Sequence, residues 1–319
     1  MKVELSHTKD GPLDATSSLE ESDPIEPTTD EQPIRSVVVI ILNFNGVEDT
    51  IQCVESLSLL DERGVRIVVL DNGSSNDVWS RIQTSLEEDV RLLRLEKNVG
   101  VAAGWNVALG FALREYEPEF VFLLNNDAIV ERGVIDELVR FMSTSEYIGA
   151  AGPSIMKFER RSENQDARYR GIRKPFRERR LSGCALLIKK DVFDDVGFFD
   201  EQYFAYAEEA DFLERMNQHG WRSFYVPTTA KVFHKRAHTS SCISGFEAFH
   251  RTRNRLLFAG KNLTGMKFLA SIASFFFKTL PLDLMRDLSS SDRTLRIKSR
   301  ARGFVEGTRL LLRYKTRSS

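Results

Sequence analysis

The first half of the chain alternates between short, unbroken apolar runs and longer stretches in which apolar residues recur with helical spacing. The runs are rich in β-branched residues, and their starts lie 25 to 30 residues apart. They are SVVVIIL (36–42), VRIVVL (65–70), VRLLRL (90–95) and FVFLL (120–124), with helical patterns between them at 47–59, 78–86 and 102–114. Continuous apolar strands alternating with helices indicate βαβ units with right-handed crossovers. The pattern therefore predicts an α/β fold with a mostly parallel central sheet flanked by helices.

The second half is less regular. A helical pattern at 134–142 and a strand pattern at 148–156 precede residues 157–180, which are rich in Arg and poor in large apolar side chains. This composition predicts a long, mobile loop, which could contact a diphosphate or an anionic acceptor, or could be a solvated insertion. Strand patterns follow at 181–189, 223–226 and 230–234, with a helix at 207–220 and further helices from 246 onward.

Charge is unevenly distributed along the 319 residues, although the net charge is only −1. Residues 1–34 carry nine acids against two lysines and few large apolar groups, which is typical of a disordered segment. Residues 251–319 carry sixteen Lys or Arg against four acids. We therefore predict a disordered acidic tail (1–34), an α/β domain (35–260) and a basic helical C-terminal extension (261–319).

Cysteine usage and hydropathy favour a cytoplasmic protein. Cys53, Cys184 and Cys242 form neither a disulfide framework nor a metal-ligand spacing, and no signal peptide is expected from the acidic N-terminal residues. No apolar run is expected to reach the roughly 18 residues that span a bilayer. The most apolar run, FLASIASFFF (268–277), lies among basic residues. It indicates either a helix lying on the inner face of the cytoplasmic membrane or a helix packed on the catalytic domain.

Polar side chains follow the ends of the four predicted strands. Because parallel strands end at one edge of a sheet, these side chains are expected to line one rim, where α/β sheets bind ligands. The residues are Asn43, Asn45, Asp71, Asn72, Asn98, Gly100, Asn125, Asn126 and Asp127. Asp71 is suited to hydrogen-bond a ribose or base edge, or to cap a turn. Gly100 and Gly104 flank a helix start whose N–H groups would suit a diphosphate, although no dinucleotide or P-loop motif is present.

Asp127 is the candidate metal ligand of this rim. An oxygen ligand suits a hard divalent cation such as Mg2+ or Mn2+. A single carboxylate is a small ligand set, and His234 at the end of a later strand is the best second contributor.

The helix predicted at 207–220 carries a carboxylate on its apolar face. Phe212, Leu213 and Met216 form the apolar stripe, and Glu209 falls at its centre, whereas Asp211 falls nearly opposite. Burial would raise the pKa of Glu209 toward the range of a general base, while the helix N-terminus and a metal would oppose the shift. Glu208 is adjacent, so the two acids can couple.

Taken in order, these segments resemble the inverting glycosyltransferases of family 2, and within them the rhamnosyltransferase-like group. The resemblance covers residues 36–260 and rests on VVVIILNFNG, LDNGSSND, NVGVAAGWN, LLNNDA, SGCALLIKKDVFDDVGFFDEQYF, AEEAD and VFH. TRNRLLF (252–258) and RGFVEGTRL (302–310) are similar to endings of that family. The resemblance implies the GT-A fold.

The resemblance also implies roles for individual residues. Asp71 would contact the nucleoside, Asp127 would bind the metal on the donor diphosphate with help from His234, and Glu209 would deprotonate the acceptor hydroxyl, with Glu208 beside it. The other residues expected to bind substrate are Asn43, Asn45, Asn98, Gly100, Asn125, Asn126, Gly183 and Asp211. Two positions depart from the family pattern: Asn125 stands where the metal motif has Asp, and Glu209 stands where the acidic pair has Asp.

The predicted reaction is a metal-assisted single displacement, with inversion, from a UDP-, dTDP- or GDP-sugar to a hydroxyl of a glycan or lipid-linked glycan. A sugar nucleotidyltransferase would keep the metal carboxylate without needing Glu209 or His234. A protein that binds nucleotide sugars without turnover is the other alternative, and Asn125 is the feature that suggests it. Nucleic-acid binding is not expected, because aromatic residues are not interleaved with the basic ones.

Overall fold

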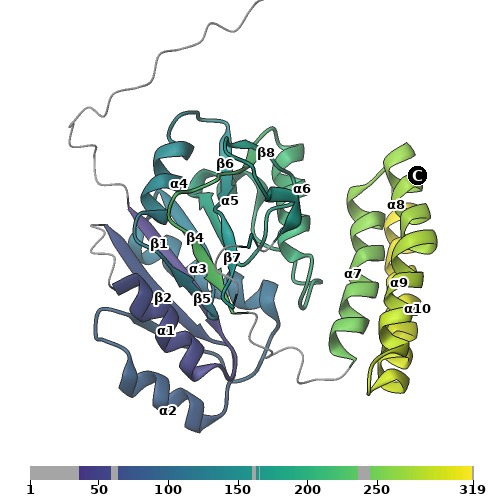
Figure 1. Ribbon diagram of the computed structural model, residues 1–319, viewed down its shortest axis with the longest axis horizontal. Coiled ribbons are helices and arrows are strands. Elements are labelled where there is room, and N and C mark those ends of the chain that lie inside the picture. The colour runs from purple at the N-terminus through teal and green to yellow at the C-terminus, as the bar shows by residue number, and fades with distance from the viewer. Residues whose placement is uncertain (1–35, 59–63, 160–162, 165, 236–244, 318–319) are drawn as a thin grey trace, which may run out of the picture. The chain divides into compact units, whose positions relative to one another are not determined.

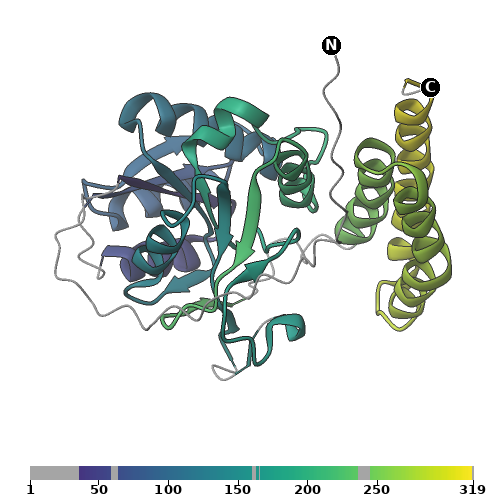
Figure 2. The ribbon, with the colours of Figure 1, turned by 90° about the horizontal axis from the view of Figure 1, so that it is seen from above.

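The computed structural model describes residues 36–58, 64–159, 163–164, 166–235 and 245–317. The predicted acidic tail, Cys242 and the remaining gaps lie outside the described residues. Figures 1 and 2 show the described chain in two perpendicular views.

An eight-stranded sheet forms the centre of the α/β part, in the order β3-β2-β1-β4-β9-β6-β10-β8. Its strands are β1 (Val37–Asn43), β2 (Val65–Asp71), β3 (Arg91–Arg94), β4 (Phe120–Asn125), β6 (Ile148–Gly152), β8 (Phe176–Arg177), β9 (Ala185–Lys189) and β10 (Arg222–Tyr225). Strands β1 to β4 are parallel, as the apolar runs predict, whereas β9 is antiparallel to β4 and β6. The start of β9 therefore lies beside the end of β4, at the rim where the polar residues gather.

A second sheet of three short strands has the order β5-β11-β7. It consists of β5 (Ala128–Val130), β7 (Ile155–Lys157) and β11 (Val232–His234). In β11, His234 pairs with Ala128 of β5, which directly follows Asp127. This pairing brings two segments that are about a hundred residues apart in sequence to the same end of the large sheet.

Helices cover both faces of the large sheet (Figure 1). They are α1 (Val47–Ser58), α2 (Asn76–Ser85), α3 (Val101–Tyr116), α4 (Val134–Met142), α5 (Lys190–Val196) and α6 (Glu208–Gln218). Alternate residues of β1 enter two separate apolar clusters: Val37, Val39 and Ile41 pack with residues of α1 and α4, while Val38 and Ile40 pack with residues of α3 and α6. Burial of both faces explains why the β1 run is apolar without interruption.

The described part of the Arg-rich segment 157–180 is packed, not freely solvated. It contains a short 3-10 helix (Ala167–Tyr169) and β8, which pairs with β10. Tyr169 is buried and stacks on Tyr225, with 4.0 Å between ring centroids. The sequence prediction of a mobile loop is therefore wrong for these residues, because aromatic side chains anchor a segment that is otherwise polar.

The C-terminal residues form helices, as predicted. They are α7 (Phe246–Asn262), α8 (Gly265–Ser274), a π-helical turn (Phe275–Thr279), α9 (Leu280–Leu288) and α10 (Arg293–Arg317). Helices α7 and α10 pack closely: a Cβ at Gly260 would lie 2.7 Å from the Cα of Leu311, and one at Gly303 would lie 2.4 Å from the carbonyl oxygen of Phe249. Helix α7 runs through the predicted domain boundary at 260.

The expectation that no apolar run reaches about 18 residues is wrong for these helices. The apolar run does not stop at Pro281, because this proline occupies the first turn of α9, where a missing N–H is tolerated, and the π-helical turn joins α8 to α9. The resulting helix, Gly265–Leu288, has 24 residues and is long and apolar enough to cross a membrane by length and composition. Only 6% of its most apolar window is buried.

Candidate functional site

The rim formed by the ends of β1 and β2 is a dense hydrogen-bonded network. Asn43 and Asp71 are register partners, and Asn43 Nδ2 donates to Asp71 Oδ1 at 2.7 Å. Asn43 Oδ1 accepts from the Gly46 N–H and from Thr50 Oγ1, each at 3.0 Å. Both ends of the Asn43 amide are therefore engaged in fixing the turn between β1 and α1.

Asp71 is completely buried at the end of β2. Besides Asn43, its carboxylate accepts from the hydroxyl and the N–H of Ser74, at 2.5 and 3.2 Å, and lies 3.7 Å from Nε of Arg94. A buried carboxylate needs such compensation to remain charged. Asp71 thus organises the turn that follows β2, and its contact with a nucleoside stays a prediction.

Two further predicted residues complete the network. Asn45 adopts a left-handed conformation (φ 57°), its N–H donates to Ser74 Oγ at 2.8 Å, and its Oδ1 accepts from the N–H of Ser75. Asn126 Nδ2 donates to Thr50 Oγ1 at 3.1 Å. The turn after β4 is thereby tied to the turn after β1, as the convergence of strand ends predicts.

The backbone groups of the loop before α3 form hydrogen bonds with other groups of the protein. The Gly100 N–H donates to Asn98 Oδ1 at 2.8 Å, and the Asn72 amide bridges the Val99 N–H and the Gly100 carbonyl. The first N–H of α3, on Val101, donates to the carbonyl of Phe204 at 2.6 Å. One of the N–H groups expected to face a diphosphate is therefore engaged by the chain itself, and diphosphate binding at this helix start stays a prediction. Gly100 has φ 92°, and a Cβ would lie 2.6 Å from that same oxygen.

Asp127 and His234 lie side by side at the end of the small sheet. His234 Nε2 is 3.1 Å from Asp127 Oδ1, and the two side chains are 14% and 10% exposed. Two adjacent ligands of an octahedral ion with bonds of about 2.1 Å are separated by about 3 Å, so this pair fits a hard divalent cation. Within the described residues no group of three or more His, Cys, Asp or Glu could hold a metal. A metal here would complete its shell with oxygens from a substrate.

The turn that leads into α6 has an unusual backbone. Tyr206 and Ala207 have φ values of 69° and 71°, and Ala207 is the N-cap residue of α6. The left-handed conformation costs about 1 to 2 kcal/mol for each residue that carries a Cβ. Such strain persists only where surrounding contacts determine it, and it gathers at functional sites. Glu208 and Glu209 follow immediately.

Glu209 is packed against Gly183, as the apolar stripe predicts for an inward-facing carboxylate. A Cβ at Gly183 would lie 3.4 Å from the Glu209 Cβ. Glu209 also lines a cavity of about 450 Å3 together with Leu181, Ser182 and Tyr225. The segment that contains Gly183 also contacts the rim at the end of β4, because the Asn125 N–H donates to the Cys184 carbonyl at 2.9 Å.

Both acids of the pair have one carboxylate oxygen, Oε2, that is shielded from solvent and has no hydrogen-bond partner among the described residues. Burial raises the pKa of Glu209, while the N–H groups of the first turn of α6 and the charge of Arg251 oppose the shift. Burial and the neighbouring Glu209 carboxylate raise the pKa of Glu208 well above its usual value. Two adjacent buried carboxyl groups do not both ionise readily, so the pair is suited to hold one proton near neutral pH.

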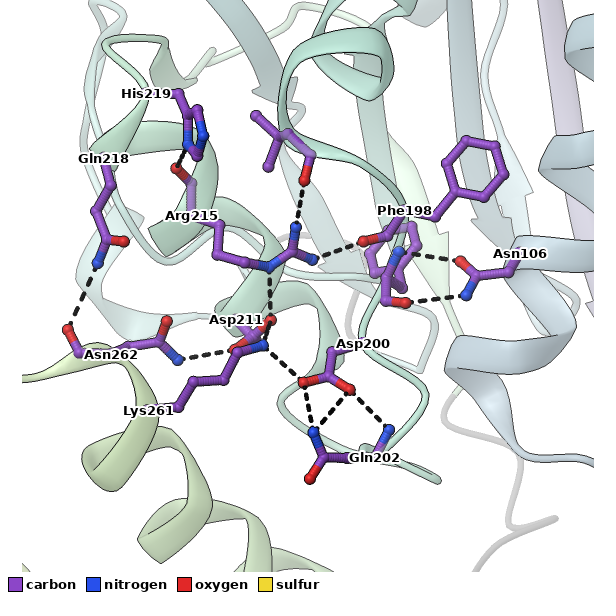
Figure 3. A network of polar contacts seen from close by, with 12 residues as sticks. Asn106, Phe198, Asp200, Gln202, Asp211, Arg215, Gln218, His219, Lys261 and Asn262 are labelled. Atoms are coloured by element: carbon purple, nitrogen blue, oxygen red, sulfur yellow. Dashed lines mark hydrogen bonds and ion pairs between the residues drawn. The ribbon is translucent and has the colours of Figure 1, made fainter. Parts of the chain in front are cut away.

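Asp211 is not among the residues that line the cavity, and it belongs to a polar network with Arg215, Lys261 and Asn262 (Figure 3). It is fully buried and accepts from Arg215 Nε at 2.9 Å, Lys261 Nζ at 2.9 Å and Asn262 Nδ2 at 2.8 Å. Lys261 also pairs with Asp200 at 2.6 Å. The structure therefore does not bring Asp211 to the Glu208–Glu209 pair but uses it to join α6 to the end of α7.

Two Arg side chains near the cavity have no ion-pair partner among the described residues. Arg180 lines the cavity. Burial and the nearby charges of Arg180 and Arg251 lower the pKa of Arg255 on α7, while Asp283 opposes the shift. Arg168, which also lines the cavity, is neutralised by Asp166 at 2.5 Å. The acceptor side of the site therefore carries several Arg side chains, of which Arg180 and Arg255 have no ion-pair partner among the described residues.

Sequence reasoning missed several residues that build the site, above all Asn254 of α7. Its Nδ2 donates to the carbonyls of Ala205 and Tyr206, each at 2.8 Å. The available signal was an Asn, a weak helix former, at a position that the helical pattern of Leu256 and Leu257 places among buried residues.

The chain matches known glycosyltransferases. The sequence profile of Glycosyl transferase family 2 matches residues 38–252. An N-acetylglucosaminyl-diphospho-decaprenol L-rhamnosyltransferase of Mycobacterium tuberculosis is 31% identical over 58% of this chain and 71% of the relative. A low-salt glycan biosynthesis hexosyltransferase of Haloferax volcanii is 24% identical over 69% of this chain and 74% of that protein.

Solved structures agree on the fold. S. aureus TarS (residues 1–349) has a TM-score of 0.58 at 15% identity, covering 85% of this chain and 80% of that one. A mannosyltransferase from Pyrobaculum calidifontis, in complex with GDP-Man and Mn2+, has a TM-score of 0.55 at 16% identity, covering 88% and 91%. The predicted GT-A fold is thereby confirmed.

Proposed function

The chain belongs to glycosyl transferase family 2, and from this premise we propose that it transfers a hexosyl or deoxyhexosyl group from a nucleotide-diphosphate sugar to an acceptor hydroxyl, with inversion. The observation that carries the proposal is the Glu209 carboxyl group. It has an oxygen without a hydrogen-bond partner among the described residues and lines a cavity that Ile155 of β7 also lines. Strand β7 pairs with β11, which ends at His234 beside Asp127.

The reaction follows from the position of Glu209. Its carboxylate removes the proton of the acceptor hydroxyl while the hydroxyl oxygen attacks the anomeric carbon from the face opposite the diphosphate. The bond between that carbon and the phosphate oxygen breaks, and the nucleoside diphosphate leaves with the electron pair. The pKa of Glu208 is raised well above its usual value by burial and by the Glu209 carboxylate, so we expect Glu208 to hold the shared proton while Glu209 ionises.

Asp127 and His234 would hold Mg2+ or Mn2+, which when bound neutralises charge on the departing diphosphate. The fit rests on their 3.1 Å separation and on the oxygen and nitrogen donors that they offer. Asn125 does not supply a second carboxylate, so we expect the metal to bind together with the donor and weakly without it.

The acceptor we propose is a glycan attached to a lipid through an anionic group. The named reaction of the mycobacterial relative uses a diphospho-lipid. In this chain, Arg180 lines the cavity of Glu209 and Arg255 lies close enough to Arg180 for the two charges to interact. Neither has an ion-pair partner among the described residues, and guanidinium groups suit a phosphate or diphosphate. By the same relative, a rhamnosyl donor such as dTDP-rhamnose is the first to test.

The exposed helix Gly265–Leu288 supports contact with a membrane that carries such an acceptor. Its side chains include Met266, Phe277 and Met285, which are 78%, 87% and 64% exposed. Apolar groups of this size on one exposed helix, with basic residues nearby, suit an interfacial position on an anionic bilayer. We infer a cytoplasmic protein that lies on the inner face of the cytoplasmic membrane.

The donor site is tested by thermal unfolding of the full chain with UDP, dTDP or GDP, each with and without Mn2+. We expect one nucleotide to raise Tm only when Mn2+ is present, and Asp127→Ala to abolish this shift. The matched control is Asp136→Ala, which removes an exposed acid of α4 and should leave the shift intact. No shift with any nucleotide would contradict the proposal.

The product separates the remaining alternatives. With a dTDP-sugar and a lipid-linked acceptor, a glycosyltransferase releases nucleoside diphosphate, whereas a nucleotidyltransferase, given a nucleoside triphosphate and a sugar phosphate, releases pyrophosphate. A protein that only binds the donor releases neither.

Membrane contact is tested by flotation of the protein with anionic liposomes. We expect wild type to float and a variant with Met266→Glu, Phe277→Glu and Met285→Glu to remain in solution, because all three side chains are exposed and the fold does not depend on them. Tyr147→Glu changes an equally exposed side chain of the α/β part and should float like wild type. Equal flotation of all three proteins would contradict membrane contact through this helix.

A further inference from the structure

The segment that leads into α6 is held from two sides. On one side, the carbonyl of Phe204 accepts the N–H of Val101, at the start of α3. On the other side, the carbonyls of Ala205 and Tyr206 both accept from Nδ2 of Asn254 on α7. Three consecutive carbonyls thus have partners far away in sequence, immediately before the Glu208–Glu209 pair.

Asn254 is saturated by these contacts. It is fully buried, both hydrogens of its amide nitrogen are used, and its Oδ1 accepts from Nη1 of Arg253 at 2.7 Å. The same Nη1 donates to the carbonyl of Gln202 at 2.9 Å, and Arg253 Nε pairs with Glu306 of α10. Residues 202–206 are therefore held by hydrogen bonds from α7, and α10 supports these bonds through Glu306.

These hydrogen bonds lie next to the strained part of the backbone, at Tyr206 and Ala207. Tyr206 and Ala207 both have left-handed φ values although both carry a Cβ. Neither residue has an intrinsic preference for this conformation, so contacts from outside the turn must maintain it. Two hydrogen bonds from one buried amide, to the carbonyl of Tyr206 and the one before it, are suited to do so.

We propose that Asn254 is a positioning residue for the transfer reaction: it locks the Tyr206–Ala207 turn and thereby sets Glu209 against the acceptor hydroxyl. The proposal rests on the proposed function for what Glu209 does, but the lock itself is a property of the fold. The C-terminal helices are then part of the catalytic unit, and not only a means of reaching a membrane.

The test compares two changes of similar size on the same helix. Asn254→Asp keeps the volume but replaces the donors with a carboxylate that faces two carbonyl oxygens. Thr252→Val is the matched control, because Thr252 is also buried and accepts from Arg300 Nη1 at 2.9 Å, without touching the turn. Both variants lose buried hydrogen bonds on α7, so both should lower Tm.

Only Asn254→Asp should affect catalysis strongly. We expect kcat to fall by about 100-fold, which is the effect of a misplacement of about 1 Å, while KM for the donor changes less than threefold. Thr252→Val should keep at least a third of wild-type kcat. Equal kcat for Asn254→Asp and wild type, or equal losses in both variants, would overturn the proposal.

The pH profile gives a readout that a purely structural role would not move. Glu209 faces Glu208 on its own helix and Arg251 on α7, and its cavity is also lined by Asp166, Arg168 and Arg180. Release of the turn should hydrate Glu209, so the acidic limb of the kcat profile should shift to lower pH in Asn254→Asp. An unmoved limb would indicate that Glu209 has kept its surroundings.

A second variant keeps the test informative if Asn254→Asp is poorly folded. Ala207→Gly removes the Cβ that makes the left-handed turn costly, and combined with Asn254→Asp it should restore kcat about tenfold. Amide hydrogen exchange at residues 203–209 should be faster in Asn254→Asp and unchanged in Thr252→Val. The exchange measurement does not depend on turnover. Absence of transfer in wild type would therefore contradict the proposed function, while hydrogen exchange would still test whether Asn254 holds the turn.

Discussion

The two sides of the site are built in opposite ways. On the donor side, Asn43, Asp71 and Asn126 use their polar atoms to fix the turns after β1, β2 and β4. On the acceptor side, Glu208 and Glu209 each keep one oxygen without a hydrogen-bond partner among the described residues, and the backbone before them is strained. The donor side is thus stable as it stands, whereas the acceptor side stores unfavourable free energy that the rest of the fold offsets.

This difference predicts that substitutions on the donor side mainly lower the free energy of unfolding, whereas substitutions on the acceptor side mainly lower the catalytic rate. Removing a donor-side group should cost free energy of unfolding, because its partners are left buried and unsatisfied. Removing an acceptor-side carboxylate should cost rate without costing stability, because nothing else in the described chain depends on its shielded oxygen. Three substitutions, in order of decreasing effect, test this division.

The largest effect is expected for Glu209→Gln. Loss of the general base should lower kcat by about 1,000-fold, while donor nucleotide binding stays near wild type. The measurement is initial-rate kinetics together with nucleotide titration. Glu214→Gln on the same helix removes the ion pair with Arg179 at 2.7 Å, does not touch the Glu208–Glu209 pair, and should keep its rate. Turnover of Glu209→Gln at the wild-type rate would assign the base to another residue.

Asp71→Ala should destabilise the protein by about 3 kcal/mol, because the buried donors of Asn43 and Ser74 lose their acceptor. Urea unfolding of wild type and variant measures the change. The Glu209→Gln variant should lose no stability in the same assay. If Asp71→Ala were as stable as wild type, the donor side would not be the preorganised half of the site.

The smallest effect is expected for Glu208→Gln, and its sign depends on pH. The folded-state pKa of Glu208 is raised, so the stability of wild type is full below the ordinary glutamate pKa of 4.5 and falls as pH rises through the raised value. Glutamine does not ionise, so Tm should be equal near pH 4 and about 2 to 4 °C higher in the variant at pH 8. Thermal unfolding across this range checks it, and a lower Tm at pH 8 would mean that the Glu208 carboxylate is stabilised in the fold.

Much of the fold could be predicted from short-range pattern. The apolar run 36–42 indicated a strand buried on both faces, and β1 has that environment. The stripe of Phe212, Leu213 and Met216 indicated where Glu209 would face, and Glu209 meets Gly183 and the cavity. These inferences succeeded because helix and strand periods reveal which side of an element is apolar.

The sequence was less informative where a segment distant in sequence packs against the polar face or the end of a helix. Asp211 lies opposite the apolar stripe, yet it is buried, because Lys261 and Asn262 arrive from α7 fifty residues later. The start of α3 has the sequence of an anion site, yet its first N–H group, on Val101, donates to the carbonyl of Phe204. A local sequence pattern does not reveal such a partner, because the partner comes from a segment that is distant in sequence and is brought there by the fold.

The sequence by itself therefore determined the strands, the helices, the polar rim and the inward face of Glu209, since each depends on residues within a few turns of one another. Only the tertiary structure decided that β9 runs antiparallel to β4, that Lys261 covers Asp211, and that Asn254 holds the Tyr206–Ala207 turn. These contacts join residues that are 48 or more positions apart. Periodicity shows which face of an element is apolar, but only the packed fold determines what lies against it.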